Sequence, residues 1–202
     1  MQKTYTYPEF AYRQSTEQRD GTLARHPVVI IGAGPIGLTQ ALDLAYRGVP
    51  SIVLDDNNTV SIGSRAVCYA KRALEIWDRL GVGQGFADRG IQWQVGKVFF
   101  HDDLAYQFDL LPEAQHKMPA MINLQQYYLE ENLVEACEAS PLVDLRWKHK
   151  LLSLEQNDDV ATLTVETPDG VFKMEAQWVI AADGANSDTR RMTGADFTGH
   201  FF

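Results

Sequence analysis

Two short apolar runs lie on either side of an amphipathic stretch between residues 28 and 54. Residues 28–31 are four β-branched residues in a row, as expected of a strand buried on both faces. Residues 38–45 then carry apolar side chains at helical spacing, and Gly48 is a plausible helix stop. Residues 51–54 repeat the buried-strand pattern and lead into Asp55. This order predicts a βαβ unit with parallel strands and a right-handed crossover.

The pattern beyond this unit predicts further helices and a run of strands. Amphipathic spacing indicates helices over residues 70–80 and 124–139. Stretches rich in β-forming residues, bounded by turn sequences, indicate strands at 94–100, 105–108, 143–154, 160–166, 171–174 and 178–182. We expect the strands between residues 143 and 174 to form an antiparallel meander and the last strand to be buried. The predicted fold class is therefore α/β, a parallel sheet joined to a β-meander.

Composition and charge narrow the possible functions. The 202 residues are 45% hydrophobic and 22% charged, which is ordinary for a globular protein. A net charge of -9, with no cluster of Lys and Arg, argues against a nucleic-acid partner. No apolar stretch is long enough to cross a membrane, and the N-terminal residues lack the apolar core of a signal peptide. We therefore expect a cytoplasmic protein without a membrane segment.

The cysteines and histidines show no spacing that indicates a metal. Cys68 and Cys137 are far apart and outside any CxxC pattern, so we expect two reduced thiols. The five histidines form no HxxxH or similar pattern, and no metal site is predicted. No Ser/His/Asp arrangement occurs in the context of a nucleophile elbow. The sequence thus assigns no catalytic acid, base or nucleophile.

A glycine-rich motif connects the first predicted strand to the first predicted helix. Gly32, Gly34 and Gly37 form the pattern GxGxxG. Gly32 permits a tight turn, Gly34 lets a pyrophosphate approach the backbone, and Gly37 lets helix and strand pack closely. The free N–H groups at the helix start face the phosphates and are helped by the helix dipole.

Asp55 closes the second strand of the same unit, at the place where such motifs carry an acidic residue. Its carboxylate can accept two hydrogen bonds from an adenosine ribose diol and would repel a 2′-phosphate, which disfavours NADP. The expected ligand contacts are Gly32, Ala33, Gly34, Ile36, Gly37 and Asp55. This site fits FAD and NAD alike, because both contain an ADP moiety.

A second motif distinguishes these two cofactors. Asp183 and Gly184 follow the last predicted strand, with Ser187 and Arg190 beyond them. The segment resembles the DGxxSxxR motif of FAD-dependent aromatic hydroxylases of the para-hydroxybenzoate hydroxylase type. In that family the Asp lies near the ribityl-pyrophosphate region of FAD, which implies this role for Asp183. For Arg190, a structural role is at least as well supported as a direct contact with the cofactor.

Two further segments resemble the same family. Arg65, in the sequence Gly63-Ser64-Arg65-Ala66, matches an Arg that reaches the FAD pyrophosphate, a task suited to a planar, bidentate cation. Gln126 matches a Gln or Arg that precedes a helix with inward leucines and hydrogen-bonds to FAD, and Gln125 is the alternative. Within the family, the chain is most similar to bacterial 3-(3-hydroxyphenyl)propionate hydroxylases and related phenol hydroxylases.

The resemblance covers residues 27–202 and implies a Rossmann-like FAD-binding domain there. Residues 1–26 are then an N-terminal extension, and residues 93–122 contribute the start of the substrate-domain region. Family members are longer and carry a third FAD motif with a Gly-Asp pair, which does not occur in this sequence. We therefore expect a domain that is incomplete relative to the family, from a truncated or fragmentary gene product.

The resemblance also implies a reaction. The complete enzyme would be an NAD(P)H-dependent monooxygenase that uses FAD and O2 to hydroxylate a phenolic substrate, with NAD(P)H bound only transiently. The aromatic substrate, the choice between NADH and NADPH and the oligomeric state stay open. One alternative is a flavin oxidoreductase of the same fold with other chemistry, and another is a non-catalytic FAD- or nucleotide-binding remnant. An NAD-dependent dehydrogenase explains neither the segment from Asp183 to Arg190 nor the meander.

Overall fold

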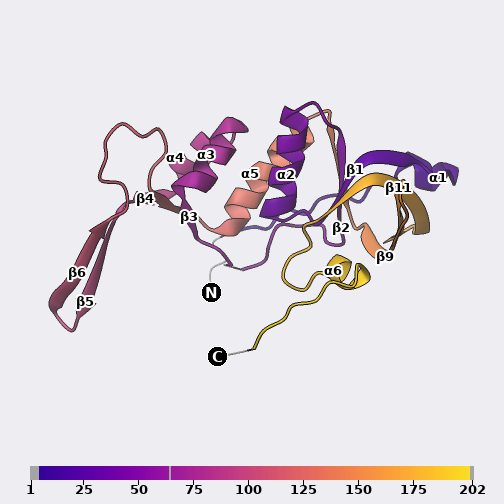
Figure 1. The fold of residues 1–202 in the computed structure, drawn as a ribbon. Helices are drawn as coiled ribbons and strands as arrows, with labels where there is room; N and C mark the ends of the chain where they lie inside the picture. The colour runs from indigo at the N-terminus through magenta and orange to yellow at the C-terminus, as the bar shows by residue number, and fades with distance from the viewer. Residues whose placement is uncertain (1–4, 64, 201–202) are drawn as a thin grey trace. The chain divides into compact units, whose positions relative to one another are not determined.

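The computed structural model describes residues 5–63 and 65–200, and the chain divides into two units. The first unit contains Met1–Ile62 and Leu133–Phe202, and the second contains Gly63–Asn132 (Figure 1). The glycine-rich motif lies in the first unit, whereas Arg65 and Gln126 lie in the second.

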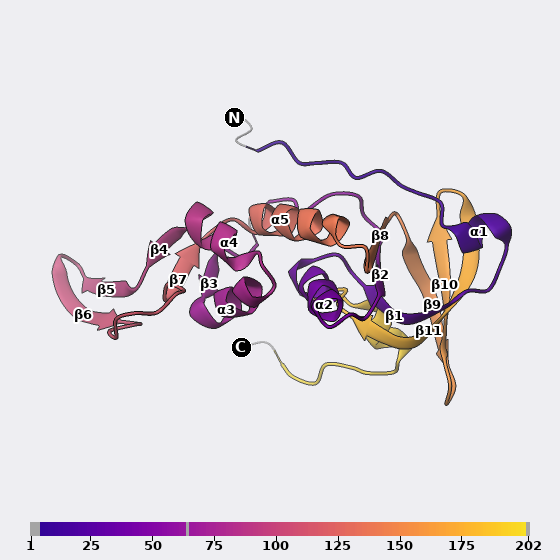
Figure 2. The same ribbon diagram turned by 90° about the horizontal axis from the view of Figure 1, so that it is seen from above.

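A six-stranded mixed sheet is the frame of the first unit. Its strands lie in the order β8-β2-β1-β11-β10-β9 (Figure 2). Their bounds are β1 (Arg25–Ile31), β2 (Ser51–Asp55), β8 (Val143–Trp147), β9 (Lys150–Gln156), β10 (Ala161–Thr167) and β11 (Gly170–Ala181). The pairs from β8 to β11 are parallel, and β11, β10 and β9 pair antiparallel. The predicted α/β class, with a parallel sheet and a β-meander, is confirmed.

Helix α2 (Pro35–Tyr46) completes the predicted βαβ unit. It packs against β1, β2 and β8, and its residues Leu38, Ala41 and Leu42 are buried at helical spacing. The helix begins earlier than the apolar pattern indicates, because Pro35 occupies the first turn, where a missing N–H breaks no intrahelical bond. Apolar side chains from β1, β2 and the meander form one continuous core, which includes Val29, Ile31, Leu54, Leu163, Val165 and Met174.

Some strand predictions differ from the structure. The predicted strand 143–154 breaks at Lys148, whose φ of 57° turns the chain, so that β8 joins the parallel sheet and β9 the meander. The predicted strands 171–174 and 178–182 are a single strand, β11, since no turn-forming residue lies between them. Trp178 in this strand is 72% exposed rather than buried. In the described part of the chain, β10 begins at Ala161, opposite Ala176, and so gives the end of β11 no neighbour on that side.

Residues 5–21, here called the N-terminal strap, are anchored to the first unit. The strap contains the short helix α1 (Thr16–Asp20), which Ser15 caps by accepting a hydrogen bond from the Gln18 N–H. The ring of Phe10 stacks on Trp147 of β8, with centroids 4.5 Å apart. The strap therefore lies against the edge of the parallel sheet.

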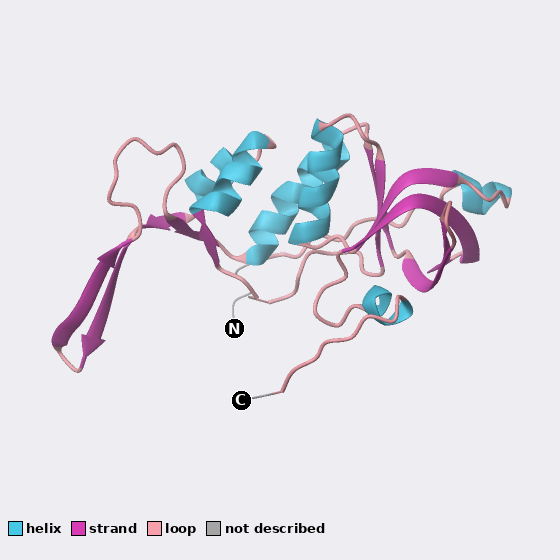
Figure 3. Ribbon diagram, viewed as in Figure 1, coloured by secondary structure: helices cyan, strands magenta, loops and turns pink. Residues whose placement is uncertain are grey.

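The second unit contains short strands, the helices α3 and α4 and the start of α5 (Figure 3). A three-stranded sheet has the order β3-β7-β4 and is formed by β3 (Cys68–Ala70), β4 (Ile91–Trp93) and β7 (Met121–Asn123). Helices α3 (Lys71–Arg79) and α4 (Gly83–Arg89) pack together through Trp77 and Phe86, whose ring centroids are 5.1 Å apart. Helix α5 (Gln126–Ala139) begins in this unit and ends in the first.

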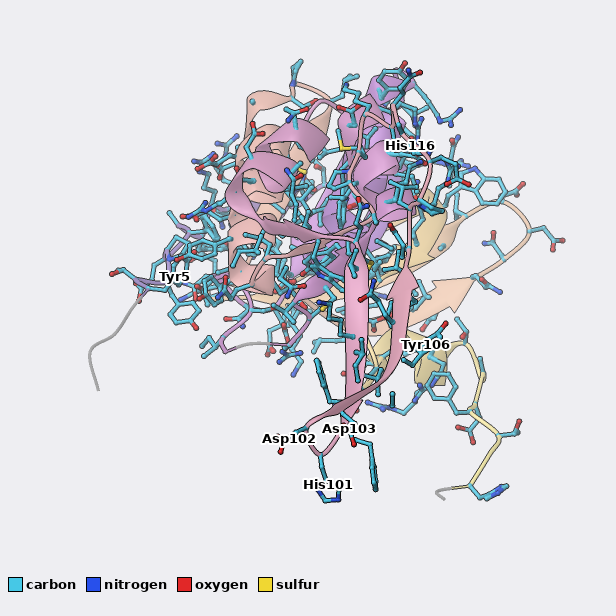
Figure 4. All side chains as sticks on the ribbon, turned by 90° about the vertical axis from the view of Figure 1, so that its left-hand side faces the viewer. Tyr5, His101, Asp102, Asp103, Tyr106 and His116 are labelled. Atoms are coloured by element: carbon cyan, nitrogen blue, oxygen red, sulfur yellow. The ribbon has the colours of Figure 1, made fainter. Side chains whose placement is uncertain are left out.

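A hairpin of β5 (Val95–Phe100) and β6 (Asp103–Asp109) also belongs to the second unit. His101 and Asp102 form its turn, and Figure 4 shows the side chains of His101, Asp102 and Asp103 at the tip. The assignment of residues 93–122 to a substrate-domain region stays a prediction.

Candidate dinucleotide-binding site

The turn between β1 and α2 is held by two glycines that leave no room for a side chain. Gly32 has a φ of 105°, and a Cβ there would lie 2.5 Å from the carbonyl oxygen of Ala182, just beyond β11. A Cβ on Gly37 would overlap the carbonyl oxygen of Gly32. These contacts match the expected roles of the two glycines, a tight turn and close packing of helix against strand.

Gly34 differs from these two glycines. It is the N-cap of α2 with φ -78° and ψ -177°, a conformation that any residue can adopt. Apart from its two chain neighbours, no heavy atom of the described residues lies within 4 Å of the position of a Cβ on Gly34. Protein packing therefore does not require glycine here, and open space lies beside the loop.

That space lies at the positive end of α2. The first N–H groups of a helix have no intrahelical partner, and the helix dipole adds partial positive charge there. The first turn of α2 carries no acidic side chain that would compete with a bound anion. Of the other predicted contacts, Ala33 is buried and Ile36 is 73% exposed at the same turn. The arrangement suits a phosphate or pyrophosphate.

Asp55 is tied to the glycine-rich loop through its side chain. Its Oδ2 accepts a hydrogen bond from the Ala33 N–H at 2.6 Å, and its Oδ1 accepts one from the Asn57 N–H at 2.9 Å. The residue is half-buried at the end of β2. The structure thus brings together the glycine-rich loop and the acidic residue, as the sequence predicts.

Asp183 follows β11, the strand beside β1, so it lies next to the same loop. The Ala182 N–H donates to the carbonyl oxygen of Ile31 at 2.8 Å. The carboxylate of Asp183 accepts hydrogen bonds from Ser187 Oγ at 2.6 Å and the Thr189 N–H at 3.0 Å. Burial raises the pKa of Asp183, but these hydrogen bonds outweigh burial and hold the pKa below its ordinary value.

Asp183 therefore organises the start of the short helix α6 (Asp188–Met192). Thr189 was not predicted as its partner, since the spacing of the motif points to Ser187 and Arg190 only. The Arg190 guanidinium donates to the Ala185 carbonyl oxygen at 3.3 Å and lies over the Phe197 ring at 4.0 Å. These contacts agree with a structural role for Arg190.

The second unit holds the remaining predicted contacts. Gln126 is buried at the start of α5, where its Oε1 accepts from the Ala66 N–H at 3.1 Å and its Nε2 donates to Glu130 at 2.7 Å. Gln126 thus fixes the segment that carries Arg65, whose side chain is exposed. Gln125 is exposed as well. Ser64, which precedes Arg65, lies outside the described residues.

Two general properties of the described residues bear on the site. Within residues 5–63 and 65–200, no group of three or more His, Cys, Asp or Glu side chains is placed to hold a metal ion. None of the helices there is long and apolar enough to cross a membrane.

The fold and the loop together define a nucleotide-binding protein of the Rossmann type, with open space at the start of one helix and a carboxylate at the end of the next strand. The chain belongs to the FAD binding domain family, which matches residues 25–201.

Similar sequences come from flavin-dependent hydroxylases. The para-nitrophenol 4-monooxygenase of Pseudomonas sp. (strain WBC-3) is 30% identical over 174 residues, which is 85% of this chain and 43% of that protein. The 3-(3-hydroxy-phenyl)propionate/3-hydroxycinnamic acid hydroxylase of Mycolicibacterium smegmatis is 26% identical, over 85% of this chain and 31% of that protein. The resemblance to aromatic hydroxylases is confirmed, and the chain spans less than half the length of each of these relatives.

Solved structures agree with the sequence relatives. The p-nitrophenol 4-monooxygenase PnpA from Pseudomonas putida DLL-E4 superposes with a TM-score of 0.82 at 31% identity, covering 89% of this chain and 46% of that chain. The flavin-dependent monooxygenase PieE, solved in complex with FAD and substrate, gives a TM-score of 0.75 at 25% identity, covering 87% and 33%.

Proposed function

We propose that this chain holds FAD through the glycine-rich loop and Asp55, as the FAD-binding part of an NAD(P)H-dependent monooxygenase that hydroxylates a phenolic substrate. The observation that carries the FAD site is the contrast within the motif. Gly32 and Gly37 are required by protein packing, whereas Gly34 leaves open space at the start of α2, where a ligand can approach the backbone.

Each residue of the site has a separate part in this proposal. The pyrophosphate of FAD lies over Gly34, where the first N–H groups of α2 donate to its oxygens. The Asp55 carboxylate accepts hydrogen bonds from the adenosine ribose. Asp183 fixes the turn after β11 that closes the loop from the other side. For Arg65 and Gln126, the proposed contacts with FAD rest on the family resemblance.

The reaction is proposed from the relatives. Two of them act, by their names, on para-nitrophenol and on 3-(3-hydroxy-phenyl)propionate, and both compounds are phenols. When bound, FAD would supply the redox chemistry that connects NAD(P)H, O2 and the aromatic ring, while the protein binds and orients the cofactor. Cys68 and Cys137 are free thiols, which suits the cytoplasm as the proposed location.

Gel filtration of the purified protein after mixing with FAD tests the cofactor. Flavin absorbance that elutes with the protein is the expected result. A protein that retains NAD but not FAD would overturn the flavin assignment.

Turnover tests the reaction. The FAD-loaded protein should oxidise NADH or NADPH faster when a phenol is added, and one oxygen atom from labelled O2 should appear in the product. Retained FAD without any phenol-dependent incorporation of oxygen would instead support flavin binding without hydroxylation.

A further inference from the structure

The N-terminal strap is a feature of this chain outside the family match. The match begins at residue 25, whereas the strap comprises residues 5–21. The strap nevertheless contacts the turn that follows Asp55, next to the proposed adenosine site.

Three backbone hydrogen bonds hold this turn. The Phe10 N–H of the strap donates to the carbonyl oxygen of Asn58 at 2.8 Å. From the β8–β9 turn, the Lys148 N–H donates to Asn57 at 3.0 Å and the His149 N–H donates to Asp55 at 2.8 Å. The turn is therefore held from the strap and from the start of the meander at once.

The side chain of Phe10 reinforces the same contact. Its ring stacks on Trp147 with centroids 4.5 Å apart and an interplanar angle of 14°. Trp147 is only 4% exposed and is the register partner of Asp55 across the β2–β8 pair. Phe10 thus covers the end of β8, which lies directly beside Asp55, the residue proposed to bind the ribose.

Two anchors keep the strap in this position. In α1, Glu17 pairs with Arg146 of β8 at 2.5 Å, and their side chains are 6% and 9% exposed. Between α1 and Phe10, the Tyr12 hydroxyl lies 3.2 Å from Thr167 Oγ1 and donates to Asp169 at 2.9 Å. Arg146 precedes Trp147 on β8, whereas Thr167 and Asp169 lie at the turn between β10 and β11. The Tyr12 anchor therefore fixes the strap at a place separate from the contact with Asn58.

We propose that the strap positions the adenosine half of FAD, with Phe10 as a positioning residue that holds the Asp55–Asn58 turn through Trp147 and Asn58. Phe10 does not itself contact the cofactor. The inference rests on the proposed FAD site and deepens it, because it assigns a segment outside the family match to cofactor affinity.

The test uses ADP, which carries only the adenosine diphosphate half of FAD. Calorimetry measures the Kd for ADP, and the Tm of each variant is measured in parallel. Phe10→Ala should raise the Kd for ADP and for FAD by a similar factor, about threefold to tenfold, because it removes an aromatic stack beside Asp55. Phe10→Tyr keeps the stack and should restore the wild-type Kd. If Phe10→Ala does not fold, Phe10→Leu keeps the apolar bulk and should shift the Kd in the same direction.

Tyr12→Phe is the matched control, because it removes the hydroxyl contacts with Thr167 and Asp169 but leaves Phe10 in place. It should lower stability without changing the Kd for ADP. An unchanged Kd in the Phe10 variants, or an equal change in Tyr12→Phe, would overturn the inference. A wild-type protein that binds neither ADP nor FAD would instead disprove the proposed function itself.

Discussion

The carboxylate of Asp55 accepts a hydrogen bond from the backbone N–H of Ala33, with Oδ2 and N 2.6 Å apart. This bond ties the end of β2 to the glycine-rich loop, so one side chain both shapes the loop and is proposed to hold the ribose. Its other oxygen accepts from the Asn57 N–H. The shape of the loop and its affinity for a nucleotide should therefore change together when Asp55 is altered.

Asp55→Asn should weaken FAD binding and lower stability. One of the two carboxylate oxygens becomes an NH2 group, which faces a backbone N–H that it cannot accept from. We expect a loss of about 1–3 kcal/mol in the free energy of unfolding, measured by urea unfolding, and a higher Kd for FAD. Asp56→Asn is the matched control, since Asp56 is exposed at the next position, and it should change neither quantity. Equal effects of the two variants would contradict the assignment.

Gly34→Ala should separate binding from folding. Apart from its chain neighbours, the added methyl group meets no atom of the described residues within 4 Å, so the free energy of unfolding should change by less than about 0.5 kcal/mol. The same methyl group lies where the pyrophosphate is proposed to approach, so the Kd for FAD should rise by about tenfold or more. Gly85→Ala in α4 also places a methyl group in open space and should leave FAD affinity unchanged. Unaltered FAD affinity in Gly34→Ala would count against the proposed pyrophosphate position.

Gly37→Ala should lower stability, in contrast to Gly34→Ala, because Gly37 is a structural glycine. Its methyl group would overlap the Gly32 carbonyl oxygen, so helix α2 must shift away from β1. Overpacking of this kind costs about 1–3 kcal/mol, and each kcal/mol lowers Tm by roughly 2–4 °C in a chain of this size. Differential scanning calorimetry without FAD measures the effect. A Tm equal to that of Gly34→Ala would show that the loop is looser than described.

The buried pair of Glu17 and Arg146 should make stability depend on acid pH. Burial alone would raise the pKa of Glu17, but the nearby His26 and the hydrogen bond from Arg146 outweigh burial and hold that pKa well below its ordinary value of 4.5. The contribution of Glu17 is therefore complete at neutral pH. It declines as the pH falls below 4.5, because the unfolded chain then takes up the proton first.

Glu17→Gln tests this coupling. At neutral pH it should cost about 3 kcal/mol of unfolding free energy, since Arg146 stays buried and, among the described residues, keeps Asp144 alone as a carboxylate partner. The difference from wild type, followed by urea unfolding, should shrink between about pH 5 and pH 3. A difference that is independent of pH would show that the substitution acts through packing rather than charge.

The two cysteines should differ in reactivity. Burial raises the pKa of the Cys137 thiol to about 12, so little thiolate forms at neutral pH. Cys68 is exposed. A disulfide reagent should therefore modify Cys68 in the native protein and reach Cys137 only after unfolding, as mass spectrometry of labelled peptides can verify. Rapid labelling of Cys137 in the native protein would mean that its surroundings open readily.

The parts of the fold that the sequence predicts best are those with strong local patterns. The βαβ unit, the meander strands and helix α5 each repeat apolar positions over several residues, and the structure contains all of them. Strands β3, β4 and β7 were not predicted, because three residues are too short for a period to emerge. The break at Lys148 was also not predicted, since a lysine with positive φ has no sequence signal.

The candidate site is likewise predicted from the sequence only in part. The roles of Gly32, Gly37 and Asp55 follow from the spacing of the motif, and their contacts agree with it. The approach of Ala182 to Gly32 joins distant segments, and only the strand order of the sheet brings them together. The strap carries no known motif, so its contact with the turn after Asp55 could be recognised only from coordinates.

The position of β1 in the sheet has a consequence for the order of events during folding. On one side β1 pairs with β2, its neighbour in sequence, and on the other side with β11, near the far end of the chain. During synthesis, the βαβ unit can form as soon as β2 has left the ribosome, but Gly32 has no Ala182 to pack against until β11 has followed. Such non-local pairing is slow to form. The nascent chain should therefore acquire nucleotide affinity late, as one of the last steps of its maturation.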